Sequence, residues 1–145
     1  MHLRNLTLYS IFIRCCGGTF DAVRADLPRI KALGADAIWL LPIHPIGTDK
    51  RKGSLGSPYA IRDYRAINPE FGTLEDFAAL CDAAHALDMK VLIDVVYHHT
   101  SPDSVLVKTH PEYFYKKPDG SFGNHVGDWT DIVDFDFSAR GFGTN

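Results

Sequence analysis

Apolar residues in the first hundred positions alternate between strand-like and helix-like spacing. Residues 6–14 are rich in β-branched and aromatic side chains, which predicts a strand. Residues 36–41 and 90–96 are short, nearly continuous apolar runs, typical of strands buried on both faces of a sheet. Between these runs, apolar side chains recur at helical spacing over residues 20–33 and 73–87. The predicted order is strand, helix, strand, helix, strand.

The residues at the helix ends support this interpretation. Thr19 is suited to cap the first helix, and Gly34 is suited to end it with a left-handed backbone. Pro28 lies inside the pattern and predicts a kink or a break. Thr73 is suited to cap the second helix, and Asp76 three residues later nearly completes a capping box.

Two long polar segments separate these elements or follow them. Residues 43–68 form a loop with several glycines, and a loop of this length in a compact domain is usually functional. In residues 98–145 we expect no helix and only short strands.

Alternating strands and helices predict an α/β fold with parallel strands, as an open sheet or a closed (β/α)8 barrel. Residues 15–19 lack the Gly-x-Gly-x-x-Gly pattern of dinucleotide-binding folds.

Composition excludes several classes of protein. The chain has 145 residues, 46% hydrophobic and 23% charged, with a net charge of −3. This is ordinary globular composition and argues against a disordered chain, a disulfide scaffold or a basic nucleic-acid-binding surface. No apolar run approaches the roughly 18 residues of a membrane span. The odd set of Cys15, Cys16 and Cys81 favours reduced thiols, so we expect a cytoplasmic protein without nucleic-acid or membrane partners.

Asp94 is the residue that most strongly indicates a functional site in this sequence. It lies near the carboxyl end of an apolar strand, and a buried carboxylate costs several kcal/mol unless it is paired. In parallel α/β folds the carboxyl ends of the strands face the active site. Asp94 is therefore either a site residue or a buried ion-pair partner of a neighbouring strand.

Two histidines follow Asp94 directly. If the strand continues, His98 and His99 point to opposite faces and cannot chelate a metal as a pair. One of them can then face the site, and the alternative is that both are loop or surface residues.

The long loop and the acidic C-terminal segment hold further candidates. Tyr59 and Tyr64 could stack on a flat ligand such as a sugar or could pack the loop. Asp63 could bind a ligand hydroxyl or pair with a neighbouring arginine. The acidic run does not match the EF-hand spacing, so we expect a solvated face there, with a metal site as the less favoured alternative. We expect the basic run at 50–52 to be solvated as well. The acidic run comprises Asp128, Asp131, Asp134 and Asp136.

Four segments, in order, give the chain a resemblance to the α-amylase family of glycoside hydrolases. ADAIWLLPIHPI resembles the second barrel strand and the loop after it, and SPYAIRDYRAINPEFGT resembles the stretch around the family's Asp-Tyr pair. LCDAAHALDMKVLIDVVYHHT resembles the third helix and strand, which end in Asp-Val-Val-x-Asn-His. Residues 102–136 resemble the opening of the excursion called domain B.

The resemblance implies a partial (β/α)8 barrel, with its first three strands in residues 1–97 and the start of domain B in 98–145. It implies a retaining glycoside hydrolase acting on α-linked glucans such as starch and maltodextrin. By position, Tyr59 would stack on the sugar and His99 would hydrogen-bond it. Asp94 and Asp63 would support the site.

No residue of this chain is predicted to be the nucleophile or the acid/base. In the family these carboxyl groups come from later strands, beyond the end of this chain, so the rest of the barrel is needed for activity. Two alternatives stay open. One is a non-catalytic glucan-binding or accessory protein, and the other is a transglycosylating member of the family.

Three positions depart from the family pattern. His98 stands where the family usually has an asparagine that often binds calcium, so we expect no cofactor and no metal ligand, and the case for calcium is weak. Ser57 and Pro58 replace the commoner pair before the tyrosine. Gly56 stands where many α-glucosidases have an aspartate, which favours an amylase-like enzyme.

Overall fold

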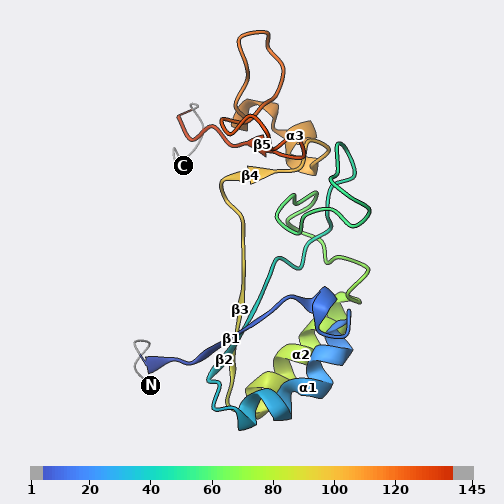
Figure 1. Ribbon diagram of the computed structural model, residues 1–145, viewed down its shortest axis with the longest axis vertical. Helices are drawn as coiled ribbons and strands as arrows, with labels where there is room; N and C mark the ends of the chain where they lie inside the picture. Colours follow the sequence, from blue (N-terminus) through green and yellow to red (C-terminus); the bar gives the residue numbers. More distant parts are fainter. Residues whose placement is uncertain (1–4, 139–145) are drawn as a thin grey trace. The chain divides into compact units, whose positions relative to one another are not determined.

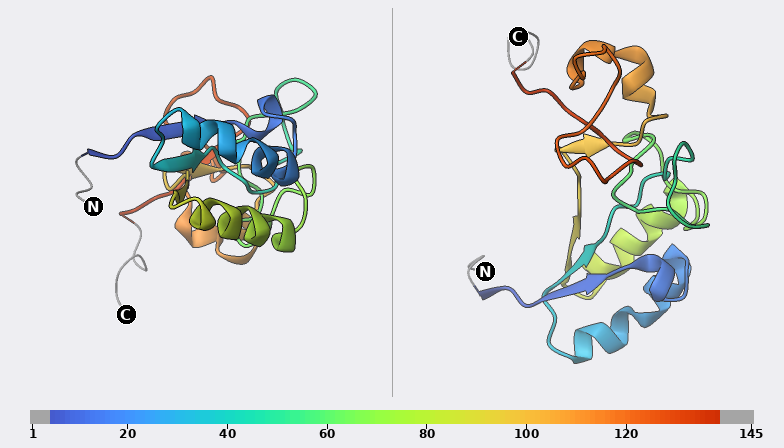
Figure 2. Two further views of the ribbon diagram at one scale, coloured as in Figure 1. Left: turned by 90° about the horizontal axis from the view of Figure 1, so that it is seen from below. Right: turned by 45° about the horizontal axis from the view of Figure 1, so that its top comes forward.

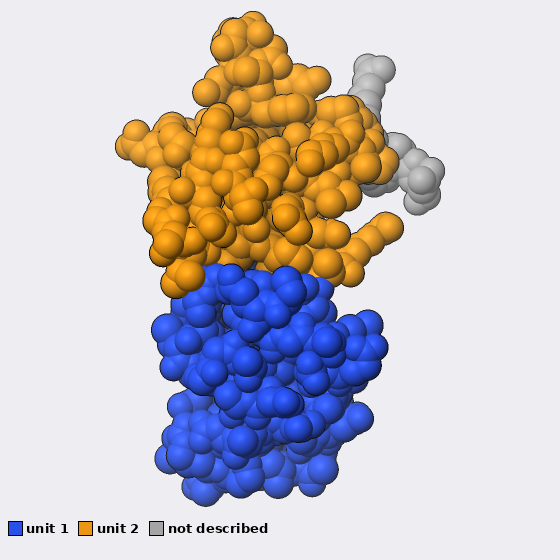
Figure 3. Space-filling model, turned by 90° about the vertical axis from the view of Figure 1, so that its right-hand side faces the viewer, with its two compact units in different colours: residues 1–43, 67–94 blue, residues 44–66, 95–145 orange. Residues whose placement is uncertain are grey.

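The computed structural model describes residues 5–138 and divides into two compact units. Within the described residues, the first unit holds the chain up to residue 43 and residues 67–94 (Figure 3). The second holds residues 44–66 and the chain from residue 95 onward. The long loop at 44–66 therefore belongs with the C-terminal segment. The predicted domain ranges 1–97 and 98–145 stay a prediction, and their ends at 1–4 and 139–145 lie outside the described residues.

The first unit is a three-stranded parallel sheet with two helices. Its strands, in spatial order, are β1 (Leu8–Ile11), β2 (Ala37–Leu40) and β3 (Lys90–Ile93). Helices α1 (Phe20–Ala32) and α2 (Leu74–Ala86) lie next to each other beside the sheet (Figures 1 and 2). Each element lies where the periodicity predicts it, although the strands are shorter. β1 ends early because the chain turns into a 3-10 helix at Ile13–Cys15.

Both helices begin as their capping residues predict. The Thr19 hydroxyl accepts the backbone N–H of Ala22, at 3.2 Å. At α2 the capping box is complete, because Thr73 accepts the N–H of Asp76 and Asp76 accepts the N–H of Thr73. α1 runs through Pro28 without a break, so the expected interruption is absent.

The core of this unit lies between the helices and one face of the sheet. Phe20 packs edge-on against Phe71, with ring centroids 6.1 Å apart, and also contacts Phe77. Fourteen buried side chains form the cluster, among them Leu27 of α1 and Leu80 of α2. Burying a leucine-sized side chain contributes about 1.5–3 kcal/mol, so this cluster holds the helices on the sheet.

One prediction about the sheet is wrong. The run at 90–96 was expected to be buried on both faces, yet Leu92 is 41% exposed and Ile93, which points to the opposite face, is 40% exposed. On the neighbouring strand Trp39 is 39% exposed, next to Leu92 in the register. Among the described residues β3 pairs only with β2, so its other edge has no strand partner. Asp94, just after β3, is partly exposed.

The second unit is built from loops with little regular structure. β4 (His99–Thr100) pairs antiparallel with β5 (Val133–Asp134). α3 (Val105–Thr109) and a 3-10 turn at Pro111–Tyr113 lie between them. The prediction of no helix in this region is wrong, because Ser104 accepts the N–H of Leu106 and starts a short turn of helix. None of the helices in the described residues combines the length and apolar character needed to cross a membrane.

Candidate functional site

The long loop at 44–66 is fixed by its own backbone. The N–H of Gly47 donates to Ala60 at 2.9 Å, and the N–H of Arg62 donates to Pro45 at 2.8 Å. An antiparallel bridge joins Ile46 to Ile61 between these bonds. The loop thus closes on itself as a compact surface loop, and its side chains are held in defined positions.

The same loop is attached to the segment that carries the two histidines. The Tyr64 hydroxyl shares its single proton between the carbonyls of Val96 and His99, each at 2.9 Å. Burial raises the pKa of Tyr64 to about 12, so this hydroxyl keeps its proton at every physiological pH. The N–H of Ser101 also donates to Ile61, at 3.0 Å. Tyr64 therefore packs and anchors the loop, which is the second of the two roles that the sequence left open for it.

A cavity of about 410 Å³ opens beside Tyr59 and His99. Tyr59 is 38% exposed and Trp129 is 48% exposed, and both line this cavity. The rings of His99 and Trp129 meet edge to face, with centroids 6.2 Å apart. Two partly exposed aromatic rings beside one buried imidazole can stack on a sugar ring and hydrogen-bond its hydroxyls. Trp129 was not predicted as a site residue.

The charges around this cavity are set by burial and by one ion pair. Burial, and secondly the neighbouring His98, lower the pKa of His99, so its imidazole is neutral at pH 7. A neutral imidazole can both donate and accept a hydrogen bond. Asp131 also lines the cavity and is only 7% exposed, with Lys52 Nζ at 3.6 Å. Asp131 is therefore not the solvated charge that the sequence predicted, whereas Lys52 is exposed, as predicted.

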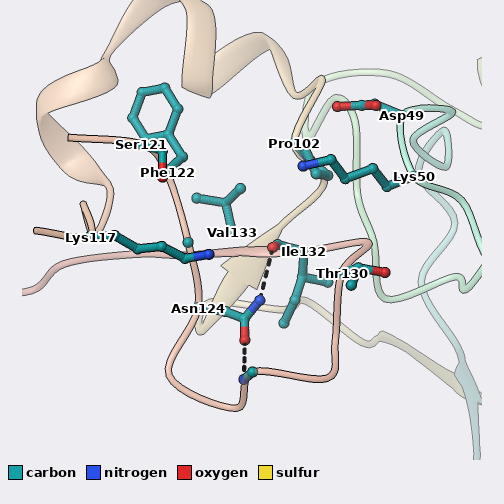
Figure 4. A pocket seen from close by; sticks show the side chains of 12 residues that line it. Asp49, Lys50, Pro102, Lys117, Ser121, Phe122, Asn124, Thr130, Ile132 and Val133 are labelled. Atoms are coloured by element: carbon teal, nitrogen blue, oxygen red, sulfur yellow. Dashed lines mark hydrogen bonds between the residues drawn. The ribbon is translucent and has the colours of Figure 1, made fainter. Parts of the chain in front are cut away.

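Asn124 positions the turn that carries Trp129. Its side-chain amide donates to the Trp129 carbonyl at 2.8 Å, and its Oδ1 accepts the N–H of Gly127 at 2.7 Å. Figure 4 shows Asn124 on the wall of a second cavity, of about 380 Å³, which Lys50 and Lys117 also line. Neither the sequence pattern nor spacing singled out Asn124.

The other predicted site residues lie elsewhere. Asp63 accepts the N–H of Arg65 at 2.9 Å and lines a different cavity with Tyr64 and Val105. It does not line the cavity of Tyr59 and His99. Asp94 is the last residue of the first unit, and its N–H donates to Leu40 of β2 at 2.9 Å. Their supporting roles stay predictions.

The two histidines meet, contrary to the prediction that they face apart. His98 Nδ1 and His99 Nδ1 are 3.2 Å apart, and the rings are nearly perpendicular. Strand alternation does not apply because His98 precedes β4, which begins at His99. Asp134 lies opposite His99 in the register, is only 1% exposed, and has His98 Nδ1 at 3.7 Å. The acidic run is therefore not a solvated face at Asp134.

Comparison with known proteins identifies relatives over most of the chain. The family model described as the α-amylase catalytic domain matches residues 7–129. An α-1,4-glucan:maltose-1-phosphate maltosyltransferase of Burkholderia pseudomallei is 41% identical over 140 residues, 85% of this chain and 12% of its own length. The enzyme of the same name from Pseudomonas aeruginosa is also 41% identical, over 85% of this chain and 21% of its length.

Solved structures confirm the fold. An α-amylase from Lactobacillus plantarum superposes with a TM-score of 0.90 at 60% identity, over 94% of this chain and 33% of that one. The noncanonic maltogenic α-amylase AmyB from Thermotoga neapolitana gives 0.89 at 45% identity, over 97% of this chain and 34% of that one. The prediction of a partial (β/α)8 barrel is confirmed. The chain spans about a third of these structures, and less of the curated relatives.

Proposed function

Because the chain belongs to the α-amylase family, we propose that the protein containing it binds α-linked glucans and hydrolyses them with retention of configuration. The cavity that brings together Tyr59, Trp129 and His99 carries this proposal. Aromatic rings pack against the apolar faces of sugars, and a buried neutral imidazole supplies a directional hydrogen bond. The 60% identity to an α-amylase supports hydrolysis as the reaction.

The two carboxyl groups of a retaining mechanism are proposed to come from outside this chain. A retaining enzyme needs a nucleophile and an acid/base about 5–5.5 Å apart. Asp131, the carboxylate that lines the cavity, has Lys52 3.6 Å away. Among the described residues that line this cavity, Asp131 alone carries a carboxyl group, so the pair that a retaining mechanism needs is not present there. We assign Asp131 to the binding surface and not to the chemistry.

Transfer of a glycosyl group is the second candidate. It is favoured by the curated relatives, which are named maltosyltransferases that use maltose 1-phosphate and are about 41% identical to this chain. Both reactions begin with the same sugar bound in the same subsite. They differ in the acceptor, which is water in hydrolysis and a glucan hydroxyl in transfer.

The test uses the full-length protein that contains this chain. We expect it to release α-configured maltooligosaccharides from maltoheptaose, followed by proton NMR of the anomeric signals. Products longer than the substrate, or phosphate release from maltose 1-phosphate that is accompanied by elongation of an added glucan, would establish transfer instead. No turnover of either donor would overturn the proposed function.

A pair of variants tests the cavity itself. Tyr59→Ala removes the aromatic ring, and we expect maltooligosaccharide affinity to fall about tenfold, which corresponds to roughly 1.4 kcal/mol. Leu55→Ala is the matched control, because Leu55 belongs to the same loop, is 54% exposed and does not line the cavity. Equal affinity in the two variants would show that sugar binds elsewhere.

A further inference from the structure

The two histidines and Asp134 form a cluster that the proposed sugar chemistry does not use in full. One ligand atom from each of His98, His99 and Asp134 lies within 4.8 Å of the others. Four ligands at 2.0–2.1 Å around tetrahedral zinc are about 3.3 Å from one another. The separations of 3.2 Å between the Nδ1 atoms of His98 and His99, and 3.7 Å from His98 Nδ1 to Asp134 Oδ1, are close to that spacing.

Only one of the two carboxylate oxygens of Asp134 is hydrogen-bonded in the described structure. Its Oδ2 accepts hydrogen bonds from the backbone N–H and from the ring Nδ1 of His125, each at 2.8 Å. Its Oδ1 has no hydrogen-bond partner in the described structure, although the side chain is only 1% exposed. A buried carboxylate oxygen without a hydrogen bond is costly, and this one faces His98. A cation between Oδ1 and the imidazoles would remove that cost.

We propose that His98, His99 and Asp134 bind a divalent transition-metal ion of the zinc type. Two imidazole nitrogens and one carboxylate oxygen are ligands that such ions prefer, whereas calcium takes six to eight oxygens. His125 orients the carboxylate from the far side, as outer ligands of zinc sites commonly do. The His98 side chain is 63% exposed, which gives the ion and a water ligand access from solvent.

The ion would also fix the tautomer of His99. Coordination through Nδ1 uses that lone pair and leaves the ring proton on Nε2. His99 would then offer a donor to a neighbouring oxygen whenever the metal is bound. The metal site therefore adjoins the proposed sugar subsite and shares one residue with it.

Metal binding is measured on the full-length protein, stripped with a chelator and titrated with Zn²⁺ or Co²⁺ alone. We expect one equivalent to bind with micromolar affinity or better. The Co²⁺ form should show the visible absorption of a tetrahedral nitrogen and oxygen site. These readouts do not depend on turnover, so failure of the proposed glucan activity would leave them unchanged.

Three variants decide the assignment. His98→Ala should weaken Zn²⁺ binding at least tenfold, and Asp134→Asn should do the same. The exposed position of His98 keeps the test valid even if the buried Asp134 variant fails to fold. His110→Ala is the control, because His110 pairs with Glu112 at 3.2 Å away from the cluster and should bind metal normally. Unchanged binding in His98→Ala, or tighter binding of Ca²⁺ than of Zn²⁺, would overturn the proposal.

Discussion

Gly47 packs closely against the segment that follows His99. A Cβ added at Gly47 would lie 2.5 Å from Ser101 Oγ and 2.6 Å from Asp103 Oδ1, and closer still to the Ser101 Cβ. Ser101 is 1% exposed, so its side chain has no free space into which it could rotate. Gly47→Ala therefore has to move one backbone away from the other.

The expected loss follows from two contributions. Overpacking a well-filled site costs about 1–3 kcal/mol. Separation of the segments would also strain the bonds from the Thr48 N–H and hydroxyl to Asp103, at 3.1 and 3.0 Å. A hydrogen bond to a charged group contributes about 1.5–3 kcal/mol, and partial exposure puts these at the lower end. After the unfolded-state gain of about 0.4–1 kcal/mol for Gly→Ala, we expect a net loss of about 2–3 kcal/mol.

Gly123→Ala is the matched control. A Cβ there would meet the Lys117 side chain at 2.5 Å, but Lys117 is exposed and flexible, so it can swing away. Neither glycine has a positive φ, so backbone strain does not distinguish them. Urea unfolding of both variants measures the difference in free energy. If Gly47→Ala lost no more stability than Gly123→Ala, the close docking of these two segments would be refuted.

Three further outcomes follow from single contacts. Thr73→Ala removes the cap of α2 and should lower the free energy of unfolding by about 1 kcal/mol in urea denaturation. Burial disfavours the charge of Asp103, but its hydrogen bonds, with the Thr48 N–H first among them, together outweigh burial and lower the pKa below 3.8. The stabilisation from Asp103 is therefore present above pH 3.8 and lost as pH falls through the lowered pKa. Asp103→Asn should therefore be less stable than the natural protein at pH 7, and the difference in melting temperature should shrink below pH 3.8. Asn124→Asp removes the donor to the Trp129 carbonyl and should weaken maltooligosaccharide binding several-fold in calorimetry, with a loss of about 1 kcal/mol in the free energy of unfolding.

The sheet and helices of the first unit were predictable because their signals are local. Thr73 and Asp76 specify a helix start through side chains three residues apart, and the structure contains both bonds of that box. Strand positions were also correct, since short apolar runs between helices have few alternatives. The burial of β3 was not predictable, because exposure of Leu92 depends on which other elements cover its face.

The cluster of His98, His99 and Asp134 could not be predicted from the spacing of these residues in the sequence. Asp134 lies 35 residues after His99, and the two meet because β4 pairs with β5 in a register that sets them opposite each other. Two-residue strands carry too little periodicity to predict such a pairing. The adjacent pair His98 and His99 could have indicated part of this cluster. Adjacent histidine side chains can converge wherever the backbone leaves the extended conformation, as it does before β4.

The three residues that we propose to bind sugar are separate from the sheet that defines the fold. Tyr59, His99 and Trp129 all belong to the second unit, outside the parallel sheet. A fold does not determine a reaction, and loops can change while the sheet keeps its packing. The matched segment is shared by enzymes named amylases and by enzymes named maltosyltransferases. We propose that the sugar subsite is common to both, which would leave the choice between water and a sugar acceptor to residues outside it.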